Sequence, residues 1–225
     1  MIAVIAPRAR AELARAPFRL QIEQPGGQAA LAEVAQYHGG LWGGNLLSGT
    51  RSGVIYSARR VLSAKRVRNG VRLLLSTTDP SRRRMVVTIS SLGAAAIRVT
   101  AVPKTARGVV EVGDSFASNR TEGFFGFGGR HNAVDQHGQV LSSFVSEENA
   151  DNNPAGNSHL YPNGDTAAYY PQAEFFSSRP YGFELVQPQL ARFKLDADGA
   201  RSWTVTASAK SLDYVVALCA DPRAN

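Results

Sequence analysis

The nine residues Gly123-Phe-Phe-Gly-Phe-Gly-Gly-Arg-His131 include four glycines and three phenylalanines. Glycine lets the backbone approach another chain or a ligand closely, and an aromatic side chain fills space. The alternation therefore predicts a strand that packs tightly against its neighbours and then turns sharply, ending in an Arg-His pair. From the residues alone two interpretations stay open, a glycine-kinked core strand and a loop that builds a binding site.

Short apolar-polar runs separated by turn signals lie on both sides of this stretch. Phe18 to Glu23 and the run 30–34 predict a hairpin, and Asn69-Gly70 is a strong two-residue hairpin signal. Further strands are expected at 54–62, 71–77, 85–91, 95–102, 109–113, 173–178, 181–186, 191–196, 202–207 and 213–219. The glycine-rich stretch 39–53 is predicted to be a loop or an insertion. More than ten short strands predict an all-β fold, a β-sandwich.

The net charge of +7 and the pI near 9.9 raise the question of a nucleic-acid partner. The basic residues concentrate in 51–84, where they alternate with apolar residues as on the solvent face of a sheet. Arg82-Arg83-Arg84 follows the turn signal Asp79-Pro80-Ser81 and is expected at a hairpin tip. Because no aromatic platform accompanies the charge, we expect a solvated face and no nucleic-acid partner.

The composition and length limit the number of domains, the kinds of stabilising site and the expected location. With 44% hydrophobic residues in 225, the chain can bury a core, and we expect 1–225 to form a single domain. The lone cysteine, Cys219, excludes an intrachain disulfide framework, and no motif spacing predicts a metal or a cofactor. The apolar run before Pro7 is too short for a signal peptide and no segment predicts a membrane span, so a cytoplasmic location is expected, unless Met1 is a mid-gene start that hides a leader.

The segment 144–168 has neither a strand period nor a helix period and is rich in polar and turn residues. A loop of about 20 residues in a compact domain is usually functional or disordered. The sequence therefore singles out this segment as a candidate contributor to a binding site.

Three blocks of sequence belong together. They are Gly123 to Gly138, the pair Tyr169 to Ser178 with Tyr181-Gly182-Phe183, and Leu212-Asp-Tyr-Val-Val216. In this order they resemble the N-terminal domain of glycoside hydrolase family 31, the family of retaining α-glucosidases, α-xylosidases and sulfoquinovosidases. Weaker similarity at Pro17 to Ile22 extends the resemblance to nearly the whole chain.

The resemblance implies a galactose-mutarotase-like supersandwich at the start of a longer enzyme. In such an enzyme this domain packs on a catalytic (β/α)8 barrel, and the enzyme acts on an α-linked sugar. Both catalytic aspartates of the family lie on that barrel, the nucleophile in a Trp-x-Asp-Met motif. Neither Met1 nor Met85 follows an aspartate. We therefore assign no catalytic residue to this chain, place the barrel outside it, and predict that it is inactive alone.

The resemblance also implies that a loop of this domain lines the substrate pocket, and the matching segment includes Glu147, Glu148, Asn149 and Asp151. In relatives an acidic residue at the position of Glu147 faces the substrate. A carboxylate there can accept hydrogen bonds from sugar hydroxyls and so help to position the sugar. Because the loop is longer here than in many relatives, Asp151 or Asn153 could take that role instead.

Arg130 and His131 stand where the family usually has a glutamate at the end of the strand. The pair could meet an anionic substituent, as on a sulfonated or uronic sugar. Alternatively, it could form an ion pair with Glu147 or Asp135.

Two rival functions remain. One is a stand-alone carbohydrate-binding β-sandwich, which should show an isolated aromatic platform, whereas a domain that packs on a barrel should expose a larger apolar patch. The other is an aldose 1-epimerase (mutarotase), suggested by His159-Leu160-Tyr161, although a suitable glutamate partner for acid-base work is missing.

Overall fold

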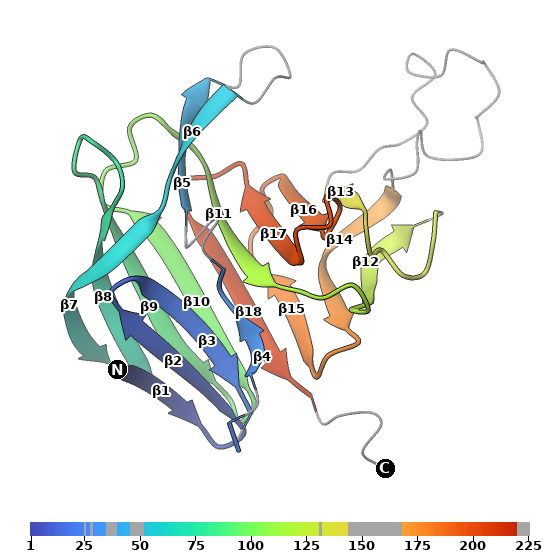
Figure 1. Cartoon of the computed structure of the whole chain (residues 1–225), viewed down its shortest axis with the longest axis horizontal. Coiled ribbons are helices and arrows are strands. Elements are labelled where there is room, and N and C mark those ends of the chain that lie inside the picture. The colour runs from blue at the N-terminus through green and yellow to red at the C-terminus, as the bar shows by residue number, and fades with distance from the viewer. Residues whose placement is uncertain are drawn as a thin grey trace.

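Antiparallel strands in three sheets make up this computed structural model, which describes residues 1–24, 26–27, 29–34, 40–45, 52–130, 132–143 and 168–219 (Figure 1). The largest sheet has eight strands. Their order is β12 (Phe124–Arg130), β14 (Ala168–Ser177), β15 (Tyr181–Leu185), β18 (Leu212–Leu218), β10 (Ala96–Pro103), β9 (Arg84–Leu92), β8 (Gly70–Thr77) and β7 (Ala58–Val67).

Two smaller sheets face the eight-stranded one. The first has the order β1 (Ile2–Ala6), β2 (Ala9–Arg15), β3 (Phe18–Glu23) and β4 (Ala29–Ala32). The second has the order β13 (Val140–Ser142), β16 (Ala191–Leu195), β17 (Ser202–Ala207), β11 (Val109–Ala117), β5 (Gly40–Asn45) and β6 (Ser52–Tyr56).

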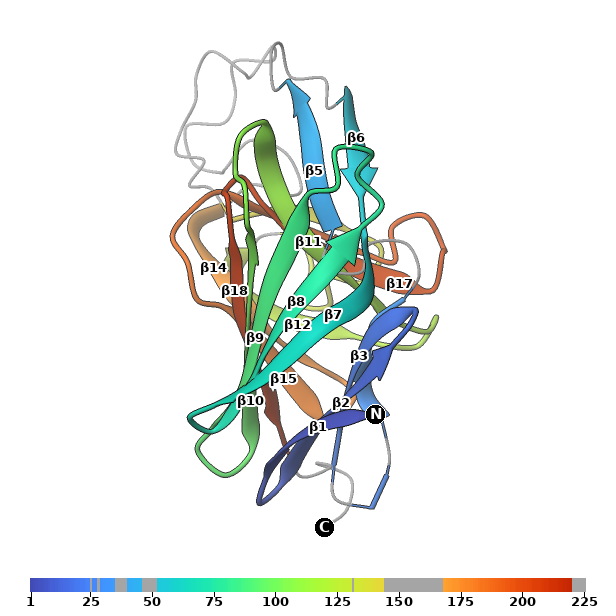
Figure 2. The ribbon, with the colours of Figure 1, turned by 90° about the vertical axis from the view of Figure 1, so that its left-hand side faces the viewer.

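The two smaller sheets together form the second layer of a β-sandwich. A single bridge between Glu33 and Phe116 connects the end of β4 to β11. Viewed from the side, β3 lies beside β7, so the four-stranded sheet covers one half of the large sheet and the six-stranded sheet covers the other (Figure 2).

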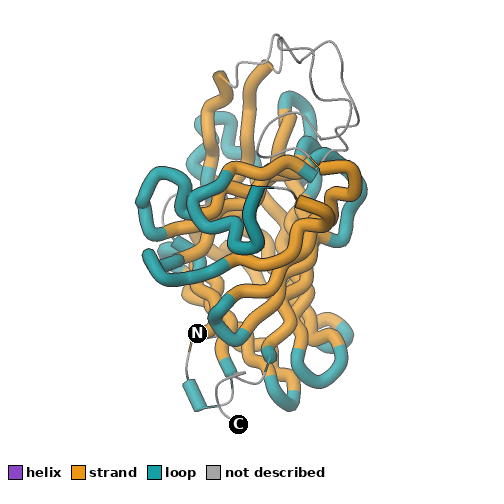
Figure 3. Tube along the Cα trace, turned by 90° about the vertical axis from the view of Figure 1, so that its right-hand side faces the viewer, coloured by secondary structure: helices purple, strands orange, loops and turns teal. Residues whose placement is uncertain are grey.

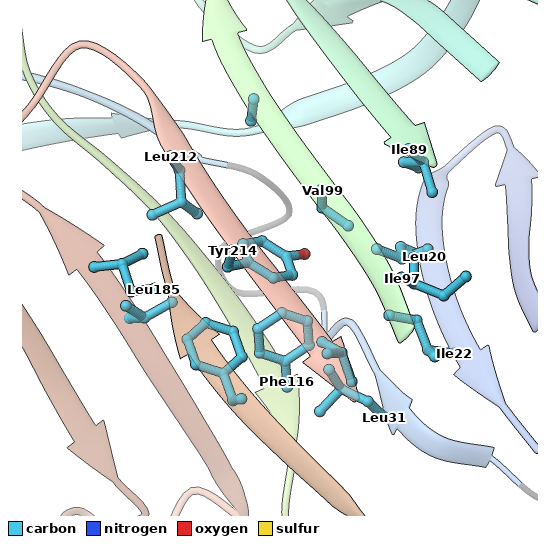
Figure 4. Close-up of a cluster of buried hydrophobic side chains, with 14 of the residues drawn as sticks. Leu20, Ile22, Leu31, Ile89, Ile97, Val99, Phe116, Leu185, Leu212 and Tyr214 are labelled. Atoms are coloured by element: carbon cyan, nitrogen blue, oxygen red, sulfur yellow. The ribbon is translucent and has the colours of Figure 1, made fainter. Parts of the chain in front are cut away.

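The core follows the alternation of the strands. Leu20 and Ile22 of β3 meet Ile89 and Ile97 of the large sheet (Figure 4). Under the six-stranded sheet the core is aromatic, and the ring of Trp203 lies 5.1 Å from the rings of Phe175 and Phe183. Aromatic rings in edge-to-face contact bury large apolar areas, so this half of the sandwich is held by a few bulky side chains.

The all-β sandwich expected from the sequence is confirmed, and so are the strands expected between 54 and 113 and between 173 and 219. Asn69 adopts the left-handed conformation, with φ of 58°, as the Asn-Gly hairpin requires. Arg82 lies in the turn between β8 and β9, as expected.

The prediction of a loop or insertion at 39–53 was wrong. Gly40–Asn45 and Ser52–Tyr56 are the paired strands β5 and β6, and β5 also pairs with β11. Glycine has a low intrinsic preference for strands, but pairing with a partner distant in the sequence overrides that preference.

Candidate functional site

Glu122, two residues before the start of β12, has a buried carboxylate. Its Oε1 accepts hydrogen bonds of 2.6 Å from the hydroxyls of both Ser177 and Tyr181, and its Oε2 lies 3.6 Å from Nη1 of Arg179. Burial, and then the charge of Glu122, raise the pKa of Tyr181 well above its ordinary value, so its hydroxyl stays a donor. Trp203 donates to the same hydroxyl at 3.0 Å. The network fixes β12 against β14 and β15.

Sequence analysis missed Glu122, although it directly precedes the Gly-Phe stretch. A buried charge needs partners, but that Glu122 is buried becomes visible only in the fold. Ser177 and Tyr181, two of those partners, belong to the second block quoted above.

A bulge follows in β12, where Gly126, Phe127 and Gly128 all have positive φ, at 130°, 66° and 79°. A Cβ on Gly128 would lie 1.8 Å from the carbonyl oxygen of Tyr170, so the two backbones touch there. Phe127 is fully buried, and its ring stacks on that of Phe175 at 5.1 Å. The Gly-Phe stretch is thus a kinked core strand, the first of the two interpretations left open.

Arg130 ends the bulged strand and contacts both flanks of the segment 144–167. Its backbone pairs with Ala168, the first described residue after that segment. Its Nη2 donates to the carbonyl of Ser142 at 2.8 Å, just before the segment, and its Nε donates to the carbonyl of Phe127 at 3.1 Å. Burial lowers the pKa of the half-buried guanidinium. Arg130 therefore holds Ser142 and Ala168 close together.

The other predicted site residues lie outside the described residues, namely His131, Glu147, Glu148, Asn149, Asp151 and Asn153. Their roles stay predictions. Asp135 accepts hydrogen bonds of 2.9 Å from the backbone N–H groups of Phe124 and His137. Among the ion pairs of the described residues, none joins Arg130 to Asp135.

The outer face of the large sheet carries a row of apolar and small residues that begins at the edge strand β12 and reaches β9. Cross-strand pairing aligns one residue from each of six strands. The residues of this outer row are Phe125, Phe176, Gly182, Ala217, Ala96 and Leu92. Phe176 is 65% exposed. Figure 3 looks onto the side of the molecule on which β12 and β14 lie in Figure 1.

Two carboxylates adjoin the outer row. Glu174 and Glu184 are directly opposite each other across β14 and β15, and both are exposed. With Phe176 they line a shallow hollow of about 200 Å³. Like charges placed opposite each other repel, so they favour a partner that offers hydrogen-bond donors or positive charge. Sequence analysis missed this pair because register, not spacing along the chain, brings the two residues together.

The described residues contain no group of three or more His, Cys, Asp or Glu side chains placed to hold a metal ion. They also contain no helix long and apolar enough to cross a membrane.

No family model and no curated protein sequence matches this chain. Solved structures do match. A GH31 family sulfoquinovosidase from E. rectale aligns over 98% of this chain and 32% of its own, with a TM-score of 0.62 and 13% identity. The cycloalternan-forming enzyme from Listeria monocytogenes aligns over 93% of this chain and 24% of its own, with a TM-score of 0.59 and 12% identity.

The alpha-N-acetylgalactosaminidase NagBb from Bifidobacterium bifidum aligns over 98% of this chain and 36% of its own, with a TM-score of 0.60 and 9% identity. At such identities the likeness is one of fold. The resemblance to glycoside hydrolase family 31 is confirmed at that level, and this chain spans about a quarter to a third of the length of the structures it matches.

Proposed function

We propose that this chain is the N-terminal domain of a retaining α-glycoside hydrolase of family 31. The observation that carries the proposal is the shared fold. Nearly all of this chain, 98%, aligns with only 32% of a family 31 sulfoquinovosidase, as expected for one domain of a larger enzyme. The β-sandwich packs on the catalytic barrel, and the barrel supplies both catalytic carboxyl groups.

The segment 144–168 completes the substrate pocket in this proposal. The contacts of Arg130 support this role, because they hold Ser142, which precedes the segment, close to Ala168, its last residue. Glu147 or a neighbouring residue, Glu148, Asn149 or Asp151, then accepts hydrogen bonds from the hydroxyls of the bound sugar. His131 directly follows Arg130 in the sequence, and in this proposal it contacts an anionic substituent on the bound sugar.

The outer row supports packing against another domain. It crosses six strands, and four of its residues are exposed, as expected for a face that a neighbouring domain covers, whereas a free sugar-binding module has an isolated aromatic platform. The exposed residues are Phe125, Phe176, Ala217 and Leu92.

The test is to express the complete coding sequence, including whatever follows Asn225, and to assay aryl α-glycosides. We expect hydrolysis with retention of the anomeric configuration, detected by NMR, and no hydrolysis by the 225-residue chain alone. Replacing 146–165 by a short glycine linker should lower kcat/KM about 10-fold or more, because positioning groups are lost. Turnover by the 225-residue chain, or an unchanged kcat/KM in the linker variant, would contradict the proposal.

A second candidate is a stand-alone carbohydrate-binding module. It is favoured by the hollow that Phe176 lines together with Glu174 and Glu184, since an aromatic side chain beside hydrogen-bond acceptors suits a sugar ring. Affinity electrophoresis in gels containing α-glucans separates the two candidates. Retardation of the isolated chain that Phe176→Ala abolishes would favour the module. A mutarotase would instead accelerate the exchange of glucose anomers.

A further inference from the structure

Two adjoining hollows surround the turn between β8 and β9, at the edge of the large sheet opposite β12. The first is about 580 Å³ and is lined by Arg82, Arg83, Arg84, Lys104 and Arg107. The second is about 720 Å³, and its lining includes Arg59, Arg60 and Arg82. Arg82 lines both hollows, so they form one continuous basic surface.

Most of the positive charges in the two hollows have no acidic partner among the described residues. Of the seven cations that line the hollows, Arg83 pairs with Asp79, and the other six form no ion pair with a described residue. Like charges gathered in a concave surface raise the local positive potential and attract anions. We call these six residues the basic cradle: Arg59, Arg60, Arg82, Arg84, Lys104 and Arg107.

The floor of the first hollow is fixed by Arg83. Its Nε lies 3.3 Å from Oδ2 of Asp79, and its Nη2 donates to the carbonyl of Arg107 at 3.0 Å. Arg83 therefore ties the β8–β9 turn to the connection between β10 and β11. Its Nη1 is buried without a hydrogen-bond partner. A buried donor atom without a hydrogen-bond partner is uncommon, because such atoms are normally satisfied.

The turn itself holds Arg82 in an unfavourable conformation. Asp79 Oδ1 accepts hydrogen bonds from the N–H and the hydroxyl of Ser81 at 2.8 and 2.6 Å. Arg82 then adopts φ of 57°, a left-handed conformation that glycine or asparagine adopts at lower cost. Strain of this kind persists where the surrounding structure imposes it, and it is often found at ligand sites. Here it coincides with the one side chain that lines both hollows.

We propose that the basic cradle binds an acidic glycan, through sulfate, phosphate or carboxylate groups carried along the sugar chain. Arginine presents a planar set of donors that matches such oxyanions. The hollows together exceed the volume of a single oxyanion, so the ligand offers several anionic groups in succession. A nucleic acid fits less well, because its bases stack on aromatic side chains and no aromatic residue lines either hollow. The cradle does not depend on the proposed partnership with a barrel.

The test measures binding of dextran sulfate to the full-length protein by titration calorimetry, with neutral dextran as the uncharged probe. The cradle variant is Arg82→Gln/Arg84→Gln/Lys104→Gln. Its matched control is Lys65→Gln/Arg66→Gln/Arg68→Gln, which removes the same charge from exposed positions outside both hollows. We expect the cradle variant to lose affinity about 10-fold or more and to show a shallower salt dependence, while the control stays within about 2-fold of the parent protein.

A second variant separates binding from folding. Arg82→Gly removes a cation but relieves the left-handed strain, so it should weaken dextran sulfate binding without lowering the melting temperature. Equal losses in the cradle and control variants would overturn the proposal in favour of net charge alone. Equal binding of neutral dextran would also overturn it, as would tighter binding of an oligothymidylate that carries the same number of charges.

Discussion

Gly128 and Gly129 are neighbours in β12 with opposite tolerance for a side chain. A Cβ on Gly128 would lie 1.8 Å from a backbone oxygen, whereas a Cβ on Gly129 would meet nothing within 4 Å. Gly128 also has positive φ, at 79°. The contact of β12 with Tyr170 of β14 therefore requires glycine at position 128, and a methyl group there is incompatible with the bulge.

We expect Gly128→Ala to lower the free energy of unfolding by about 3 kcal/mol or more, because neither backbone at the contact can move away without breaking the pairing of β12 with β14. The control is Gly129→Ala, which should stay within about 1 kcal/mol of the parent. Urea unfolding of the two variants measures the difference. Similar stabilities would mean that the bulge does not require the close approach.

Arg130 supplies the second prediction at this scale. Arg130→Met keeps much of the side-chain volume but removes the donors to the carbonyls of Phe127 and Ser142. We expect a loss of about 1–3 kcal/mol in unfolding free energy and faster proteolysis within 144–167. Arg192→Met, at an exposed position in the neighbouring strand β16, should change stability by only about 0.5 kcal/mol. Equal cleavage rates in both variants would argue against a role for Arg130 in holding the segment.

The two smaller sheets meet at a pair of buried acids, Glu33 after β4 and Asp114 in β11. Glu33 accepts a hydrogen bond from the N–H of Leu20 at 2.7 Å, and Asp114 accepts one from the hydroxyl of Tyr214 at 2.9 Å. Burial, followed by the nearby charge of Asp114, raises the pKa of Glu33 well above its usual value, and the charge of Arg19 opposes this only weakly. Glu33 is therefore protonated in the fold at pH values where an unfolded glutamate is ionised.

The raised pKa of Glu33 makes the free energy of unfolding depend on pH. The folded state holds more protons than the unfolded state between about 4.3, the usual glutamate pKa, and the raised pKa of Glu33. The free energy of unfolding should therefore fall as pH rises through this window. Glu33→Gln mimics the protonated acid, so it should lose less stability between about pH 5 and about pH 8 than the parent.

Urea unfolding across this range is the measurement, and Glu184→Gln, at an exposed glutamate, is the control. Parallel profiles for Glu33→Gln and the parent would rule out a shared buried proton at this junction.

Local patterns predicted the elements whose turns carry their own signal. Asn69-Gly70 and the turn after Asp79 set β7, β8 and β9 from a few residues. Such local patterns could not predict pairing between strands that are distant in the sequence. The glycine-rich β5 is an example, because its partner β11 lies more than 60 residues further along the chain. For the same reason the facing glutamates Glu174 and Glu184 became visible only through the register of β14 and β15.

At the scale of the whole molecule, the outer row and the basic cradle lie at opposite ends of the strands of the large sheet. The row reaches β9 at Leu92, its last residue, whereas the cradle residue Arg84 is the first residue of the same strand. A protein can therefore contact a second domain at one end of these strands while an anionic ligand occupies the other.

The outer row should make the isolated chain self-associate, because exposed contiguous apolar area favours contact between copies. Phe176→Ser should reduce association, measured by light scattering against concentration. Ile5→Ser is the matched control, because Ile5 on β1 is 70% exposed, compared with 65% for Phe176, but lies outside the row. An equal reduction by both substitutions would mean that total apolar exposure matters and the row does not.

The position of β18 has a consequence for biosynthesis. This strand, residues 212 to 218, lies between β10 and β15 in the middle of the large sheet. Until the ribosome has released it, β10 and β15 each present an unpaired edge, and the aromatic core beneath them has no closing strand. The large sheet therefore closes only after residues 212 to 218 have emerged, and until then these strand edges are open to pairing with other chains.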